Sequence, residues 1–116
     1  MSVTRKHSGP RMSQIVVHGD TVYLAGQVAE AAPAASAGEQ AAAILKRIDG
    51  LLAEAGSDKS KLLSATIWLA DMRDYDAVNE VWDAWLPEGA APARACVEAK
   101  LAFAKYTVEI GIIAAR

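Results

Sequence analysis

The segment Pro92 to Glu98 holds the most informative group of polar side chains in this 116-residue chain. Along an extended strand, Arg94, Cys96 and Glu98 point to one face, and small or aliphatic residues alternate with them on the other. A guanidinium binds a carboxylate through two parallel hydrogen bonds, so an arginine among small residues suits the recognition of an organic acid. The spacing also leaves a second interpretation open, in which Arg94 pairs with an acidic residue at a contact between subunits.

The other candidates for chemistry have plain structural alternatives. Glu109 lies in a predicted strand on the same face as Gly111, where a carboxylate serves either as a general acid or base or as half of an ion pair. No histidine is spaced to activate Cys96, so we interpret it as a small buried thiol whose backbone N–H is the more useful group. The single cysteine and the two histidines, His7 and His18, do not predict a metal site of the usual spacing.

Length and charge exclude several classes of protein. The chain carries 14 acidic and 12 basic side chains, and these are interspersed, so no positive field gathers nucleic acid. No segment approaches the roughly 18 apolar residues of a membrane span, and the first residues lack the apolar centre of a signal peptide. We therefore expect a single domain over residues 1–116 that is cytoplasmic, with no nucleic-acid and no membrane partner.

Hydrophobic spacing predicts the elements that must position these side chains. Two short β-rich runs, Gln14 to Val17 and Thr21 to Ala25, flank a Gly-Asp turn and indicate a hairpin. Ser36 and Glu39 form a capping box before an amphipathic helix, and Gly56 provides its left-handed C-terminal cap.

The second half of the chain alternates in the same way between strands and a helix. A strand with bulky side chains on both faces is expected from Leu62 to Ala70. Asp74 is expected to cap a helix that stops before Pro87. Two further strands are predicted, at Ala93 to Leu101 and Tyr106 to Ala114. The order ββαβαββ indicates an α/β (α+β) domain with a mixed sheet and both helices packed on one face.

The opposite sheet face has no predicted cover. Its candidate residues are too apolar or too small for a surface left in water: Trp68, Ala70, Cys96, Gly111 and Ile113. The chain is 53% hydrophobic, but 25 of those residues are alanine, so the core has few large side chains. Both observations favour a symmetric oligomer whose sheets meet around an axis.

Several motifs, in order, resemble those of the RidA/YjgF family of reactive intermediate deaminases. The run PARACVEAKLA, followed by YTVEIGIIAA, is similar to the C-terminal signature of that family. The resemblance extends upstream through GDTVYLAGQVA, LLAEAGSDKSKLL, SATIWLADM and YDAVNEVWDAW, and therefore covers Arg11 to Ala115. The tryptophans of the second predicted helix are typical of the short YoaB-like branch.

Membership implies a chorismate-mutase-like subunit and a homotrimer, with three clefts between neighbouring subunits. Members with this arginine hydrolyse imines, tautomers of enamines such as 2-aminoacrylate, to 2-oxo acids and ammonia, and need no metal or organic cofactor. Carried over by resemblance, Arg94 binds the substrate carboxylate and the backbone N–H of Cys96 donates a second hydrogen bond to it. Gly26 forms part of the cleft wall.

Two positions depart from the pattern of the family. Many active members read E-I-E-A-I-A near the end, and we expect the second glutamate to activate water. Here Glu109 matches the first glutamate and Gly111 takes the place of the second. An aromatic residue usually precedes Ser-Gln near the start of the pattern, where this chain has Met12. We therefore expect an intact carboxylate anchor in an altered pocket, with Glu109 displaced by about 6.6 Å along the strand from the expected acid.

Three functions follow from these residues. The first is an imine deaminase of the RidA type, anchored by Arg94. The second is a non-catalytic trimer that binds small carboxylates such as 2-oxo acids in its clefts. The third, ribonuclease action or inhibition of translation, ranks lowest because the chain is acidic overall and has no strip of aromatic and basic side chains.

Overall fold

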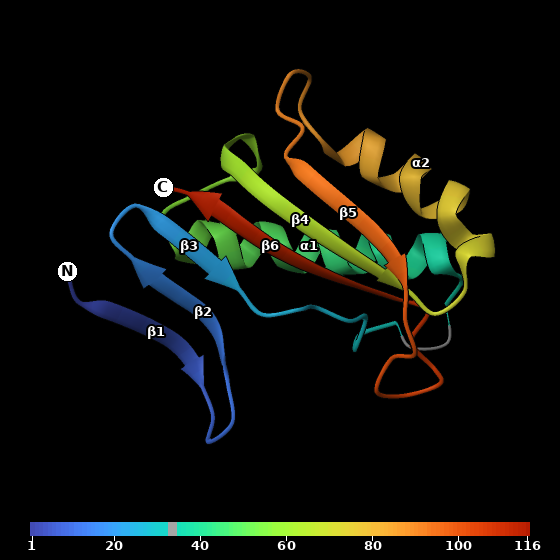
Figure 1. Ribbon diagram of the computed structural model, residues 1–116, viewed down its shortest axis with the longest axis horizontal. Coiled ribbons are helices and arrows are strands. Elements are labelled where there is room, and N and C mark those ends of the chain that lie inside the picture. Colours follow the sequence, from blue (N-terminus) through green and yellow to red (C-terminus); the bar gives the residue numbers. More distant parts are fainter. Residues whose placement is uncertain (33–34) are drawn as a thin grey trace.

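The computed structural model describes residues 1–32 and 35–116 as one mixed six-stranded sheet with two helices (Figure 1). The strand order is β1-β2-β3-β6-β4-β5, and every neighbouring pair is antiparallel except β4 and β5. The elements are β1 (Val3–Ser8), β2 (Ser13–His18), β3 (Thr21–Leu24), α1 (Ala37–Glu54), β4 (Leu62–Leu69), α2 (Tyr75–Trp85), β5 (Ala93–Glu98) and β6 (Val108–Ala115). The predicted mixed sheet and the order ββαβαββ are confirmed, with β1 added at the start.

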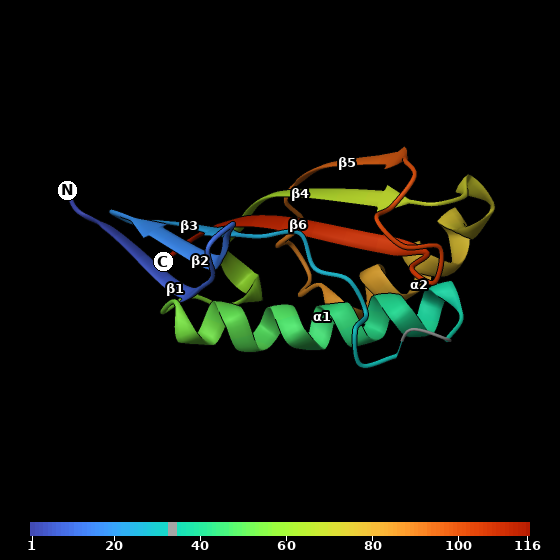
Figure 2. The same ribbon diagram turned by 90° about the horizontal axis from the view of Figure 1, so that it is seen from below.

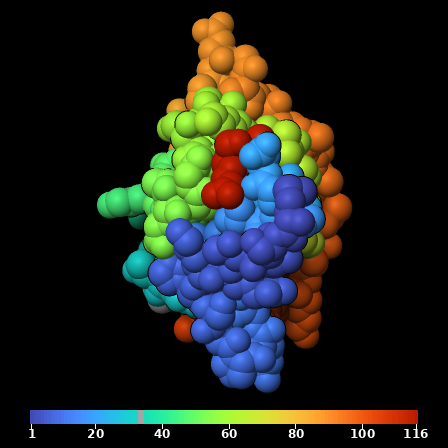
Figure 3. Space-filling model, turned by 90° about the vertical axis from the view of Figure 1, so that its left-hand side faces the viewer, coloured from blue at the N-terminus to red at the C-terminus, as the bar shows by residue number. Residues whose placement is uncertain are grey.

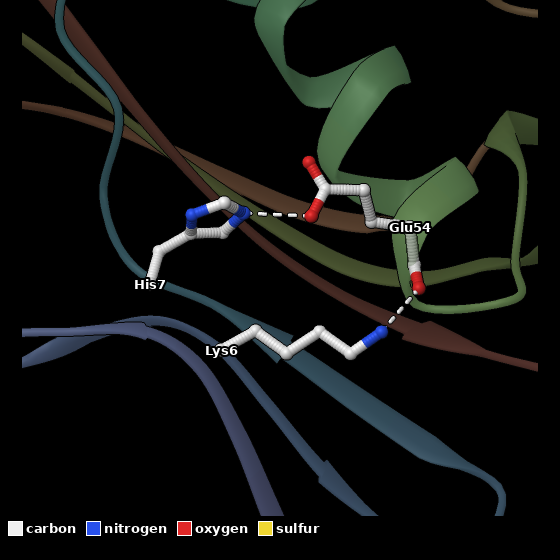
Figure 4. Close-up of polar contacts among 3 residues, drawn as sticks. All are labelled: Lys6, His7 and Glu54. Atoms are coloured by element: carbon white, nitrogen blue, oxygen red, sulfur yellow. Dashed lines mark hydrogen bonds and ion pairs between the residues drawn. The ribbon is translucent and has the colours of Figure 1, made fainter.

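The N-terminal strand β1 is the element that sequence patterning missed. All six of its residues are exposed, so it lacks the alternation of buried and exposed positions by which strands are recognised. It pairs with β2 and lies beside the end of α1, where Lys6 Nζ donates to the backbone oxygen of Glu54 at 2.8 Å (Figures 3 and 4). His7 Nε2 lies 2.6 Å from the Glu54 carboxylate, and both side chains are about half exposed.

Both ends of α1 form as the sequence predicts. The backbone N–H of Glu39 donates to the Ser36 hydroxyl, and the Glu39 carboxylate accepts from the backbone N–H of Ser36. At the other end Gly56 has a φ of +78°, and Ser57 N donates to Leu52 O at 2.8 Å. This left-handed residue ends the helix and turns the chain toward β4.

The start of α2 differs from the expectation in its cap. Asp74 occupies the N-cap position, but its side chain makes no capping hydrogen bond. Instead, a short 3-10 turn, Met72–Asp74, precedes the helix, and the Asp71 carboxylate accepts from the backbone N–H of Arg73. The predicted helix is confirmed, whereas the capping role belongs to Asp71 and acts one turn earlier.

Both helices pack on one face of the sheet, as Figure 2 shows. The side chains of β4 and β6 that point to this face are buried, among them Ile67, Ile110 and Ile112. No other element of the described chain covers the opposite face, which we call the open face. Its central residues are half-buried, and they include three of the predicted ones: Trp68, Gly111 and Ile113.

Two residues assigned to the open face lie elsewhere. The parallel register pairs Cys96 with Ile67, a core residue, so the Cys96 side chain packs on the helix face. Ala70 follows the end of β4 and is exposed in the bend beyond it. A β-bulge between Leu62 and Ser64 interrupts the alternation of side chains at the start of β4, where Leu62 is buried and Leu63 is exposed.

Candidate functional site

Arg94 lies at the outer edge of the sheet, on β5, and its side chain turns toward α2. The register that pairs Arg94 with buried Ala65 places the guanidinium on the helix face. Its Cζ lies 5.6 Å from the centre of the Trp82 ring. Together with Asn79 and Asp83 of α2, these residues line a hollow of about 360 Å³ that opens to the surface.

The Arg94 guanidinium makes no ion pair with any residue that the structure describes. Among residues 1–32 and 35–116, the two ion pairs within 4.0 Å are His7 with Glu54 and Arg73 with Asp71. Asp83 borders the same hollow, yet it is not within that distance of Arg94. The half-buried cation therefore keeps its planar donor fork available for an anion.

Cys96 follows Arg94 on the same face of β5. Burial raises the pKa of the thiol, while the nearby Arg94 charge opposes that shift. A raised pKa keeps the sulfur protonated at neutral pH and so a weak nucleophile, as the sequence predicts for an inert thiol. Ala99 N donates to Leu69 O of β4, so strand alternation turns the N–H of Cys96 toward the unpaired edge of the sheet. This donor remains a candidate partner for the carboxylate.

Glu109 lies on the open face, near the middle of the sheet. Its carboxylate rests against Gly26: a methyl group added at Gly26 would overlap Glu109 Oε2. Two backbone hydrogen bonds between Gln27 and Ile110, of 2.8 and 3.0 Å, hold the Gly26 segment beside β6. Burial raises the pKa of Glu109, which makes this carboxyl a stronger base than an exposed one.

Gly111 has a close neighbour on the open face. The ring of Trp68 lies over it, and a Cβ at position 111 would be 3.2 Å from two carbon atoms of that ring. The same residues border a hollow of about 250 Å³ together with Tyr23, Gly26 and Thr66. Trp68 therefore occupies the space into which a longer side chain at position 111 would extend. Glu109 is the carboxylate that this part of the open face offers.

The predicted site residues fall into two groups that one chain does not bring together. Arg94 and Cys96 lie on the helix face at the β5 edge, whereas Glu109, Gly26 and Gly111 lie on the open face. Met12 is 48% exposed in the turn between β1 and β2, at the opposite edge of the sheet from β5. A pocket that contains all of them requires a second copy of the chain.

Sequence reasoning missed three residues that line these two hollows. Trp82 is 3% exposed, as expected of a packing residue on an amphipathic helix, but its ring also faces the Arg94 guanidinium. Asn79 lies one turn earlier on the same face of α2, and its spacing of three residues from Trp82 predicts that the two side chains are neighbours. Trp68 was assigned to the open face, but its contact with Gly111 depends on the β4–β6 register, which the sequence does not state.

The described residues offer neither a cluster of metal ligands nor a membrane-spanning helix. Within residues 1–32 and 35–116, no three His, Cys, Asp or Glu side chains are grouped so that they could hold a metal ion. In the same part of the chain, neither helix has the length and apolar character needed to traverse a bilayer.

Comparison with known proteins gives consistent matches along the chain. A family model described as Endoribonuclease L-PSP matches residues 6–116. The RutC family protein YoaB of Escherichia coli K12 is 46% identical over 115 residues, which are 99% of each chain. A mouse protein named 2-iminobutanoate/2-iminopropanoate deaminase is 33% identical over 108 residues, covering 88% of this chain and 78% of its own.

Solved structures agree with the sequence matches. NMB1025 of Neisseria meningitidis, described as a member of the YjgF protein family, superimposes with a TM-score of 0.96 at 46% identity, covering 100% of this chain and 96% of that one. An uncharacterized protein from Pseudomonas aeruginosa gives a TM-score of 0.96 at 43% identity, covering 99% of both chains.

Proposed function

The chain belongs to the RutC/YjgF family, the family of the Endoribonuclease L-PSP model, and we propose that it hydrolyses reactive 2-imino acids to 2-oxo acids and ammonia. The observation that carries the proposal is the Arg94 guanidinium, which is half-buried in a surface hollow and has no ion-pair partner among the described residues. A relative named as a deaminase of 2-iminobutanoate and 2-iminopropanoate supports this substrate class, because both compounds carry the carboxylate that Arg94 suits.

The reaction requires the protein mainly to position the substrate and a water molecule. A protonated imine carbon is already electrophilic, so holding the carboxylate on Arg94 and the N–H of Cys96 presents that carbon to a water molecule. Glu109, with its raised pKa, takes a proton from the attacking water. The new C–O bond gives a tetrahedral carbinolamine. A proton transferred to nitrogen makes ammonia the leaving group. As the C–N bond breaks, the hydroxyl oxygen forms the carbonyl of the 2-oxo acid and gives its proton to water.

The two groups of site residues also support a cyclic oligomer, and we propose the homotrimer that the family resemblance implies. In a cyclic arrangement, one surface of each copy meets a different surface of the next. The β5 edge of one copy, with Arg94, would then face Glu109 and Gly26 of its neighbour. Met12, at the opposite edge of the sheet, would reach the same cleft. Each trimer would have three such clefts.

Imine hydrolysis tests the proposal directly. An amino-acid oxidase generates the 2-imino acid in solution, and semicarbazide traps whatever imine survives. We expect the wild-type protein to lower semicarbazone formation and Arg94→Ala to abolish that effect. Arg94→Lys is the matched control: it keeps the charge without the planar fork and should retain part of the activity. Equal imine decay with wild type, Arg94→Ala and no protein, across several amino acids, contradicts the proposal.

A second function is favoured by one observation, the placement of Arg94 and Glu109 on opposite faces of the chain. If the assembled cleft does not bring Glu109 to the substrate, the protein binds small carboxylates without turning them over. Calorimetry with pyruvate or 2-oxobutyrate separates the two functions. Binding that requires Arg94, in a protein without imine hydrolysis, favours the non-catalytic binder.

Ribonuclease action remains the lowest-ranked function, although the matching family model is described by that activity. The formal net charge of −2 offers no general attraction for the phosphate backbone. Incubation of highly purified protein with RNA provides the control experiment. Cleavage that disappears with Arg94→Ala would reverse this ranking.

A further inference from the structure

The way in which Arg94 is held differs from the usual arrangement for a half-buried arginine. A carboxylate partner would fix the guanidinium, but it would also neutralise the charge and occupy the donors that a substrate carboxylate needs. In this chain the nearby acid Asp83 makes no ion pair with Arg94. The contact that the structure gives the guanidinium is the face of Trp82, at 5.6 Å from its ring centre.

Trp82 is itself immobilised by neighbours from two helices. It is 3% exposed, and its ring centre lies 5.4 Å from that of Trp85, one turn along α2. Trp85 Nε1 donates to the Asp49 carboxylate of α1, at 3.1 and 3.2 Å from its two oxygens. Lys59 Nζ lies over the Trp85 ring at 5.6 Å. The indole under Arg94 therefore has a defined position before any ligand arrives.

An aromatic face attracts a cation through the ring quadrupole, and this attraction leaves the N–H donors of a guanidinium free. A cation–π contact with a fixed indole restricts the rotation of the guanidinium while leaving its positive charge and its planar fork intact. Ordering these groups in advance removes an entropic cost from ligand binding.

We propose that Trp82, braced by Trp85 and Asp49, is a positioning residue that aligns the Arg94 guanidinium for the carboxylate of the ligand. The proposal rests on the proposed function only for the identity of that ligand. It predicts that the π face, more than the charge of Asp83, decides how well Arg94 binds an anion.

The orientation of Arg94 is measurable without any ligand. In a nitrogen-15 NMR spectrum, the Nε–Hε group of Arg94 stacked on an indole has a ring-current shift and restricted motion. We expect Trp82→Phe to keep part of both effects, because a smaller π face remains, and Trp82→Leu to remove them. Asp49→Ala, remote from Arg94, should weaken them. Unchanged Arg94 shifts and relaxation in folded Trp82→Leu and Asp49→Ala proteins would overturn the proposal.

Ligand binding provides the second readout. Calorimetry with pyruvate should give a dissociation constant raised about two- to thirty-fold by Trp82→Leu and less by Trp82→Phe. Asp83→Asn is the matched control on the same helix and hollow: removing an acid beside an anion site should leave binding equal or tighter. In an Arg94→Lys background, which keeps a charge for the carboxylate but lacks the planar fork, the Trp82 substitutions should weaken binding much less. Equal weakening with and without Arg94 indicates a general structural role and contradicts the proposal.

These results are separable from the fate of the deaminase function. If Trp82→Leu disorders Arg94 and the wild-type protein hydrolyses no imine, the positioning role is supported and the deaminase function is rejected. If imine hydrolysis depends on Arg94 but its KM is unchanged by Trp82→Leu and Trp82→Phe, the deaminase function is supported and the positioning role is rejected. Thermal unfolding of each variant identifies any that have lost the fold, and Asp49→Ala then carries the test.

Discussion

The two faces of the sheet differ in how far a single chain buries them. On the helix face, alternate residues of β4 and β6 are fully buried against α1 and α2, so that face is complete within one chain. On the open face, Trp68, Glu109 and Ile113 are half-buried and no described element lies over them. The helix face has the composition and burial of a core, whereas the open face combines apolar area with a carboxyl of raised pKa. Such a surface is suited to an interface that also carries chemistry.

The largest expected effect tests the core side of this comparison. Ile110 points to the helix face and is 0% exposed, whereas Ile113, three residues along β6, points to the open face. Ile110→Ala leaves a cavity and should lower the free energy of unfolding by about 2–5 kcal/mol. Denaturant titration measures this effect.

Ile113→Ala is the matched variant for that measurement. It should lower the free energy of unfolding of the single chain less, because the side chain is only partly buried. If the proposed trimer forms, Ile113→Ala should shift it toward smaller species on dilution. Equal losses of unfolding free energy in both variants, with an unchanged oligomer mass, would remove the distinction between the two faces.

An intermediate effect is expected at Gly111, where the Trp68 ring leaves little space. Gly111→Glu must displace that ring and should destabilise the protein by about 1–3 kcal/mol, with a change in tryptophan fluorescence. We expect no gain in imine hydrolysis, because Glu109 already provides the carboxylate of this face.

Gly50→Glu is the matched control for Gly111→Glu. Nothing lies within 4 Å of a Cβ added at Gly50, and α1 gains helix propensity from the change, so stability should hold or rise. A Gly111→Glu protein that is as stable as wild type and hydrolyses imines faster would show that position 111 is open to an acid.

The smallest expected effect concerns pH and Glu109. Its pKa is raised in the folded protein, so the folded state holds the proton more tightly than the unfolded chain. The free energy of unfolding therefore falls as the pH rises from the ordinary glutamate pKa through the raised one, and then stays constant. Glu109→Gln removes this dependence and should raise the melting temperature slightly at neutral pH but not in acid. A lower melting temperature at neutral pH would indicate that Glu109 is a structural acid.

The sequence predicts the helix face better than the open face. Period-3.6 spacing in α1 and the caps at Ser36 and Gly56 are local signals, and they give a helix with the expected ends. β1 escaped prediction because its stability comes from pairing with β2 and from contacts of Lys6 and His7 with Glu54, none of which leaves a hydrophobic pattern. The bulge at Leu62 to Ser64 is likewise a property of the pairing with β6.

For the candidate site, the sequence predicts which residues share a face of a strand but not how the two groups are arranged. Strand alternation correctly places Arg94 with Cys96, and Glu109 with Gly111. It does not state that β5 is parallel to β4, which decides that the first pair faces α2. The contact of Trp82 with Arg94 also depends on that register, so the spacing of the sequence does not predict it.

The most direct test of the two-copy site is complementation between inactive variants. Arg94→Ala and Glu109→Gln are each expected to lack imine hydrolysis as pure proteins. After unfolding, mixing in equal amounts and refolding, about a quarter of the clefts in a cyclic oligomer would combine an intact Arg94 with an intact Glu109 from its neighbour. We predict that imine hydrolysis returns to about that fraction of the wild-type rate. Confirmed mixed oligomers without activity, beside an active refolded wild type, would contradict a site built from two copies of the chain.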